Sequence, residues 1–294
     1  MRITQRTLAD INIRNMGQNL SAIAKLNDQI SSGKALTRPS DSPSGTSTAM
    51  RTRTDLAAND QYTFNISQAS TTLAAADGAL GTMGDMLRRV RDLTVQAANT
   101  GAQSPQSLQA LSTEVSGLRD GLLAMANRTV DGRPVFGGAT SSSQAYDTDG
   151  TFTGRAGVDQ NVRISPTESV RTDIDGPTAF GSGSSDVFAL VKRIAEKMTD
   201  TPTGDLNASI ADIDSALGRL TTARTEVGVR VNRVDTVKSV NADNVLALKS
   251  QLADVEDIDP AKAYLELTLR QNAYQAALAA SSQSVQTSLV DYIR

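Results

Sequence analysis

LNASIADIDSALGRLTTARTEVGVRVNRVDTVKSVNADNVLALKSQLADV, residues 206–255, decides the fold, because apolar side chains recur in it at alternating spacings of three and four. The seam so formed consists of Leu206, Ile210, Ile213, Leu217, Leu220, Arg224, Val227, Val231, Val234, Lys238, Asn241, Val245, Leu248, Leu252 and Val255. A sustained period of 3.5 residues is typical of supercoiled helices. At ~1.5 Å per residue this helix is roughly 75 Å long, so the stretch predicts a rod of helices and excludes a compact globule.

Three seam positions in this stretch are polar, namely Arg224, Lys238 and Asn241. One interpretation is that a partner covers the seam only in part, so that these side chains face solvent. The other is that they set register or partner choice at some cost in stability. The sequence leaves both open.

Two shorter heptad runs precede this stretch. The first extends from Ile66 to Ala97, and the second from Leu108 to Met125. The second follows Ser104-Pro105, a pair typical of a helix start. The three runs predict a mainly α fold: a long antiparallel coiled-coil or helical-bundle rod formed by both chain termini, with a small β-rich central insert.

Each end of the chain carries a weaker heptad run, interrupted by polar residues such as Asn27, Gln271 and Ser281. Such helices are marginal alone and gain their stability from packing. Residues 1–53 have a net charge of +5 and residues 253–294 a net charge of −3, which favours their lying together. We predict that the ends pack in the same chain or between copies through Ile13, Met16, Leu20, Ile23, Ile30, Tyr264, Leu267, Tyr274, Leu278, Val285 and Tyr292.

The middle of the chain differs in composition. Residues 131–204 hold 10 of the 21 Gly, 4 of the 8 Pro and 5 of the 10 Tyr and Phe. Within this segment, 146–152 contains an Asp-Gly turn between ring-bearing residues, and 162–174 alternates with period two, which indicates short strands. Residues 186–199 return to a helical pattern. We expect an outward insert that can be removed, at about residues 139–180, with assembly intact.

The amino-acid composition excludes several common kinds of catalytic and metal-binding site. The chain lacks His, Cys and Trp, which excludes a Ser-His-Asp triad, a Cys nucleophile, a zinc finger and a disulfide. We therefore expect no catalytic, cofactor-binding or metal-binding residues, no cofactor and no enzymatic activity. The net charge of −3 argues against nucleic-acid binding. The sequence contains no run of 18 apolar residues, so we expect no membrane-spanning helix. The N-terminus lacks the apolar region of a Sec signal peptide.

Two charged clusters have alternative interpretations. The acidic residues at 254–259 suggest Ca²⁺, but Asp259 and Leu265 stand where an EF-hand needs Gly and Glu. Asp259-Pro260 is more typical of a helix N-cap followed by Pro. Arg88, Arg89 and Arg91 suggest phosphate binding, but their neighbouring acidic residues favour a solvated or subunit-facing helix surface.

Residues 26–43, LNDQISSGKALTRPSDSP, resemble the N-terminal signature of the flagellin superfamily. Their Arg38-Pro39-Ser40-Asp41 form is more similar to the hook-associated protein 3 branch, with Ser42 where that branch has a second Asp. The segment 131–138, DGRPVFGG, resembles the turn into that branch's insert, and 252–259, 274–279 and 288–292 resemble its C-terminal helix.

The resemblance implies a structural axial subunit of the bacterial flagellum, an adapter at the hook–filament junction. Its partners would be further copies in a ring or helical assembly, the first hook-associated protein, flagellin, and an export chaperone before secretion. It would be extracellular, exported through the flagellar type III apparatus. Residues 1–40 with 256–294 would form an inner core, 41–130 with 201–255 a rod domain, and 131–200 an outer insert.

Two other functions remain open from the sequence. The chain could be flagellin itself, the filament subunit. A cytoplasmic coiled-coil regulator or nucleic-acid-binding protein is the third possibility, supported only by the positive N-terminal region.

Overall fold

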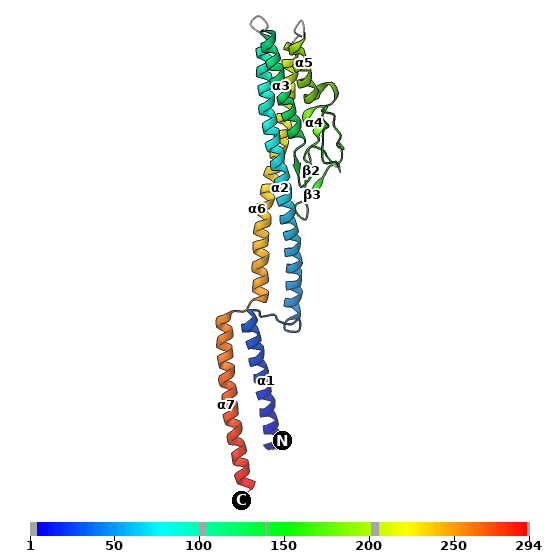
Figure 1. The fold of residues 1–294 in the computed structure, drawn as a ribbon. Coiled ribbons are helices and arrows are strands. Elements are labelled where there is room, and N and C mark those ends of the chain that lie inside the picture. The colour runs from blue at the N-terminus through cyan, green and yellow to red at the C-terminus, as the bar shows by residue number, and fades with distance from the viewer. Residues whose placement is uncertain (1–4, 100–103, 139, 141, 201–205, 293–294) are drawn as a thin grey trace. The chain divides into compact units, whose positions relative to one another are not determined.

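The computed structural model describes residues 5–99, 104–138, 140, 142–200 and 206–292. Its helices are α1 (Gln5–Ser32), α2 (Pro43–Ala98), α3 (Pro105–Ala126), α4 (Gly176–Phe180), α5 (Val187–Thr199), α6 (Asn207–Glu256), α7 (Pro260–Tyr292) and the 3₁₀ helix η2 (Gly183–Ser185) (Figure 1). The predicted mainly α fold, with long paired helices and a small β-rich insert, is confirmed. The chain divides into two compact units, residues 1–58 with 244–294 and residues 59–243.

In the unit 59–243, α2 and α6 pair along the predicted heptad seam. On α2 the side chains of Ile66, Leu73, Leu80 and Leu87, spaced by seven, are at most 2% exposed. On α6 the matching series, again spaced by seven, is at most 3% exposed and consists of Ile213, Leu220, Val227 and Val234. Since a heptad returns each side chain to the same face of a supercoiled helix, the two series form one continuous dry contact.

The shorter helices of this unit begin where capping residues occur. The Ser104 hydroxyl accepts a hydrogen bond from the Ser107 amide at 3.2 Å, with Pro105 in the first helical position of α3. The Asp186 carboxylate accepts one from the Phe188 amide at 2.7 Å at the start of α5. The two helices pack together, and the Ser112 hydroxyl donates to the Ala195 carbonyl at 2.8 Å.

The insert contains two antiparallel pairs of short strands. β1 (Thr129–Val130) pairs with β2 (Arg133–Pro134), and β3 (Asn161–Arg163) pairs with β4 (Ser169–Arg171). The predicted turn at 147–150 joins Tyr146 and Phe152, which form an isolated antiparallel bridge. The strands expected from period-two alternation are therefore present, although each is only two or three residues long.

Five rings of the insert and α5 gather in the core of this unit. The centroids of Tyr146 and Phe188 are 4.9 Å apart, and those of Phe136 and Phe180 are 5.0 Å apart, in edge-on arrangements. These rings belong to the same buried cluster as the seam residues of α2, α3 and α6. Residues 139–180 contribute side chains to the core that the helices share, so removing them would open that core. Assembly without these residues stays a prediction.

Candidate subunit interface

In the unit 1–58 with 244–294, α1 and α7 lie side by side (Figure 1). Their contact is a seam of half-buried side chains, with buried Leu26 and Ala263 near one end. We call it the facing seam; from α1 and α7 it comprises Asn12, Met16, Asn19, Ile23, Leu26, Ile30, Ala263, Leu267, Tyr274, Ala277 and Ser281. Two polar contacts cross it: the Ser281 hydroxyl lies 3.7 Å from the Met16 sulfur, and Arg270 donates to the Asn19 side chain at 3.5 Å.

The structure brings together only some of the predicted packing residues. Met16, Ile23, Ile30, Leu267 and Tyr274 lie on the facing seam. The exposed ones point away from it: Ile13, Leu20, Tyr264 and Leu278. The side chains of Val285 and Tyr292 lie outside the described residues.

The facing seam uses a different alternation from the predicted one. On α1 it follows positions 12, 16, 19, 23, 26 and 30, whereas apolar content favours 13, 16, 20, 23, 27 and 30. Sequence reasoning therefore missed Leu26 and, on α7, Ala263. Asn12 and Asn19 lie on the facing seam but are polar, so a search for apolar positions does not find this alternation.

The apolar side chains left out of the facing seam remain exposed. Ile13 is 67% exposed, Leu20 54% and Leu278 43%. We call these exposed side chains together, on whichever side of α1 or α7 they lie, the outer apolar surface; its members are Ile11, Ile13, Leu20, Tyr264, Leu265, Leu269 and Leu278. Complete burial of a large apolar side chain contributes about 1.5–3 kcal/mol, and the single chain leaves part of that contribution unused at each of these positions.

The signature segment after α1 forms a closed turn. Asp41 accepts hydrogen bonds from the Arg38 amide at 3.0 Å and the Thr37 hydroxyl at 3.0 Å, and its other oxygen pairs with Lys25 at 2.8 Å. Hydrogen bonding, first from Lys25 and then from the Arg38 amide, lowers the pKa of Asp41 to about 2. The signature Asp thus fixes the loop to the last turns of α1.

Ser42 has a defined role although it departs from the hook-associated pattern. Its hydroxyl accepts a hydrogen bond from the Gly45 amide at 3.1 Å, and Pro43 begins α2. Ser42 is therefore the N-cap of α2, a position that Ser and Asp fill about equally well.

The acidic cluster at 254–259 is used in capping and ion pairing. Asp259 accepts from the Ala261 amide at 3.0 Å, which confirms the predicted N-cap of α7. Glu256, only 4% exposed, pairs with Arg53 at 2.8 Å, and Asp257 pairs with Lys34 at 2.6 Å. Among the described residues, no group of three or more acidic side chains is placed to hold a metal ion.

The polar residues of the α6 seam divide between the two interpretations. Arg224 pairs with Asp77 at 2.8 Å on the surface, and Lys238 is exposed. Asn241 is buried and donates to the Thr63 hydroxyl at 2.8 Å and the Asn59 carbonyl at 3.1 Å. Only Asn241 therefore has the buried, satisfied geometry of a register-setting residue.

The three clustered arginines of α2 form ion pairs. Arg88 pairs with Asp85 within α2, Arg89 with Glu114 of α3 at 2.6 Å, and Arg91 with Asp214 of α6 at 2.7 Å. Their carboxylate partners leave little charge for a phosphate, so the solvated-surface interpretation fits better than the phosphate one.

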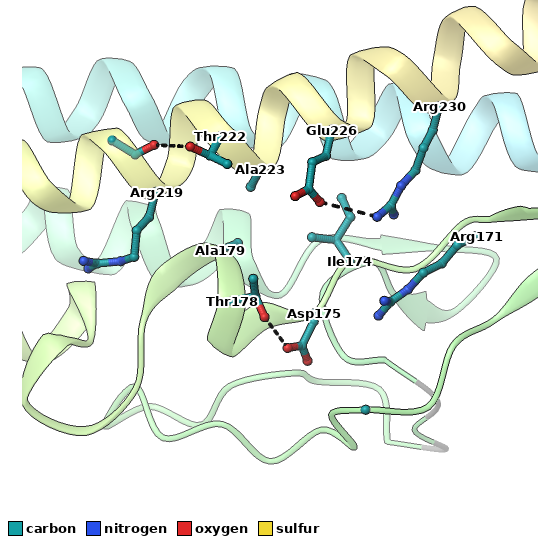
Figure 2. Close-up of a pocket in the computed structure, with 12 residues that line it drawn as sticks. Arg171, Ile174, Asp175, Thr178, Ala179, Arg219, Thr222, Ala223, Glu226 and Arg230 are labelled. Atoms are coloured by element: carbon teal, nitrogen blue, oxygen red, sulfur yellow. Dashed lines mark hydrogen bonds and ion pairs between the residues drawn. The ribbon is translucent and has the colours of Figure 1, made fainter.

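A pocket of about 400 Å³ lies between α6 and the insert (Figure 2). Its charged side chains are largely matched within the fold. Arg230 contacts Glu226 at 3.6 Å and donates to the Asp173 carbonyl at 3.0 Å, and Arg171 pairs with Asp173 at 2.9 Å. Asp175 accepts from Thr178 at 2.6 Å. The lining thus mixes three arginines with the carboxylates of Asp175 and Glu226.

The described helices include none with the length and apolar character needed to span a bilayer.

Two relatives are similar in sequence to the chain over nearly its whole length. It is 26% identical to Flagellin of Bacillus subtilis, over 98% of this chain and 99% of that protein. It is 25% identical to Flagellar hook-associated protein 3 of Escherichia coli, over 94% of this chain and 95% of that protein.

The fold is shared with a solved structure, flagellar hook-associated protein 3 of Legionella pneumophila. The TM-score is 0.62 at 14% identity, covering 70% of this chain and 98% of that one. Residues 3–141 match the family model of the bacterial flagellin N-terminal helical region, and residues 210–293 match that of the C-terminal helical region. With both terminal regions matched over most of its length, this chain belongs to the bacterial flagellin family.

Proposed function

We propose that the chain is a structural axial subunit of the flagellum and forms the adapter between hook and filament, joining the first hook-associated protein to flagellin. The observation that carries the proposal is the outer apolar surface of α1 and α7. A single chain leaves it in water, whereas a ring or helical array of copies would bury it on every subunit alike.

The place of each segment within the array is part of the same proposal. The outer apolar surface would face neighbouring copies in an inner tube formed by residues 1–40 and 256–294. Residues 41–130 and 201–255 would form the next shell, and the insert 131–200 would face outward. The subunit would leave the cell through the flagellar type III apparatus, held by an export chaperone beforehand. It would act by packing alone, without catalysis.

Flagellin itself is the second candidate, favoured by the match to the Bacillus subtilis protein over 99% of that protein's length. The junction role is supported by the match to hook-associated protein 3 at nearly equal identity. It is further supported by the Arg38-Pro39-Ser40-Asp41 turn, whose Asp41 ties the loop to Lys25.

Deletion of the gene separates the two candidates. For a junction adapter we expect assembled hooks without filaments and flagellin released into the medium. For flagellin itself we expect bare hooks and no such release. Immunogold labelling of isolated flagella should mark one narrow zone beside the hook; label along whole filaments would favour flagellin, and normal filaments in the deletion strain would contradict both roles.

A further inference from the structure

The facing seam of α1 and α7 does not specify its own register. Asn12, Asn19 and Ser281 interrupt it with polar side chains, and its heptad spacing repeats. A slip of seven residues, about 10 Å along the axis, would place Met16 opposite Tyr274 and still bring apolar side chains together. The helices belong to opposite ends of the chain, so no short loop joins them. Another contact must select the register.

Such a contact lies where α1 ends and α7 begins. Gly33, at φ +70°, terminates α1 in a conformation that favours glycine. Residues 33–35 then pair with 256–258: the Ala35 amide donates to the Glu256 carbonyl at 2.6 Å, and the Ile258 amide donates to the Gly33 carbonyl at 3.1 Å. This two-stranded contact joins the α1–α2 loop to the α6–α7 turn.

Charged side chains close the same contact. The buried carboxylate of Glu256 is held by Arg53 of α2 at 2.8 Å, with the Lys34 ammonium 3.6 Å away. Lys34 also pairs with Asp257 at 2.6 Å. A buried carboxylate deprived of its cations is strongly unfavourable, so the contact tolerates little displacement.

We propose that this group, the Glu256 clasp of Lys34, Arg53, Glu256 and Asp257, sets the register of α1 against α7. In this register Met16 meets Ser281. α1 ends at Ser32, two residues before Lys34, and α7 begins at Pro260, three residues after Asp257. A slip by one heptad therefore requires either opening the clasp or extending these short connections. Asp41 and Lys25 form a separate ion pair between α1 and the loop that follows it.

The absence of native cysteine makes a cross-linking test direct. Met16→Cys with Ser281→Cys reports the native register, and Met16→Cys with Tyr274→Cys reports the slipped one. The measurement is the ratio of the two disulfide formation rates in the full-length chain under mild oxidation. The ratio compares the two registers within the same chain, and it does not depend on the proposed function.

In the unmodified background we expect the native pair to form faster. Glu256→Ala should lower the ratio by at least about tenfold, and Lys34→Asp by about two- to fivefold. Adding Asp257→Lys to Lys34→Asp should restore the ratio, because the ion pair is formed again with its charges exchanged. A general folding defect would not be reversed by this second change. Lys262→Glu, a charge reversal in the first turn of α7 outside the clasp, should leave it unchanged.

A ratio that stays within twofold in both Glu256→Ala and Lys34→Asp would show that the seam sets its own register, and would overturn the proposal. Failure of Asp257→Lys to rescue Lys34→Asp would also overturn it, since the ion pair would then not be the cause. Glu256→Gln, which keeps the side-chain shape, should give an intermediate ratio if the carboxylate charge is what matters.

Discussion

The pair α2/α6 in one unit and the pair α1/α7 in the other share a heptad period but differ in how much they bury. Along α2 and α6 the heptad places Leu, Ile and Val in a dry core that α3, α5 and the insert complete. Along α1 and α7 the same period gives a half-buried, partly polar seam, and large apolar side chains remain outside. The same period thus gives a fully buried apolar core in one unit and incompletely buried apolar side chains in the other.

The largest expected effect is on assembly. Leu278→Asp places a charge on the outer apolar surface, where an array of copies would bury it. We expect incorporation into flagella to be abolished while the unfolding midpoint of the free chain stays unchanged. Leu278→Met, which keeps the side chain apolar, should assemble normally. Normal incorporation of the Asp variant would mean that this surface is not an interface.

The next largest effect is on the stability of the unit 59–243. Leu122 is fully buried, so Leu122→Ala should lower its free energy of unfolding by about 2–5 kcal/mol. The matched change in the other unit, Leu265→Ala, removes an exposed side chain and should cost less than about 0.5 kcal/mol. Urea unfolding followed by circular dichroism measures both. Equal costs would remove the contrast between the units.

A smaller effect concerns the polar residues of the α6 seam. Asn241→Ala removes two hydrogen bonds of a buried amide and should cost about 1–2 kcal/mol. Lys238→Ala, at an exposed seam position, should be nearly neutral. The same urea titration distinguishes them, and equal values would argue against a specific role of Asn241.

The smallest effect is electrostatic and local. The pKa of Asp41 is lowered in the folded state from 3.8 to about 2, so its contribution to stability is present above pH 3.8 and is lost as the pH falls through about 2. Carboxyl-carbon NMR should show Asp41 titrating near pH 2, and Lys25→Ala should move the midpoint toward 3.8. A wild-type midpoint near 3.8 would mean that the loop is open in solution.

The sequence predicts the α2/α6 pair well and the α1/α7 pair only in part, for a physical reason. In residues 206–255 twelve of the fifteen seam positions are apolar, so apolar content locates the seam correctly. In α1 the side chains of Ile13 and Leu20 are apolar yet exposed in the single chain, so apolar content selects the wrong alternation and passes over Leu26. The Glu256 clasp joins residues more than two hundred positions apart, and no local pattern reveals such a pairing.

Whether the terminal pair is completed only by neighbouring copies is tested most directly by hydrogen exchange of the free chain and of isolated flagella. In the free chain we expect amides at Leu20, Ile23 and Leu267 to exchange much faster than at Leu217, because the facing seam alone buries too little to offset the entropy of ordering two helices. In assembled flagella the four should be similarly protected. Protection of Leu20, Ile23 and Leu267 in the free chain as strong as that of Leu217 would contradict the account.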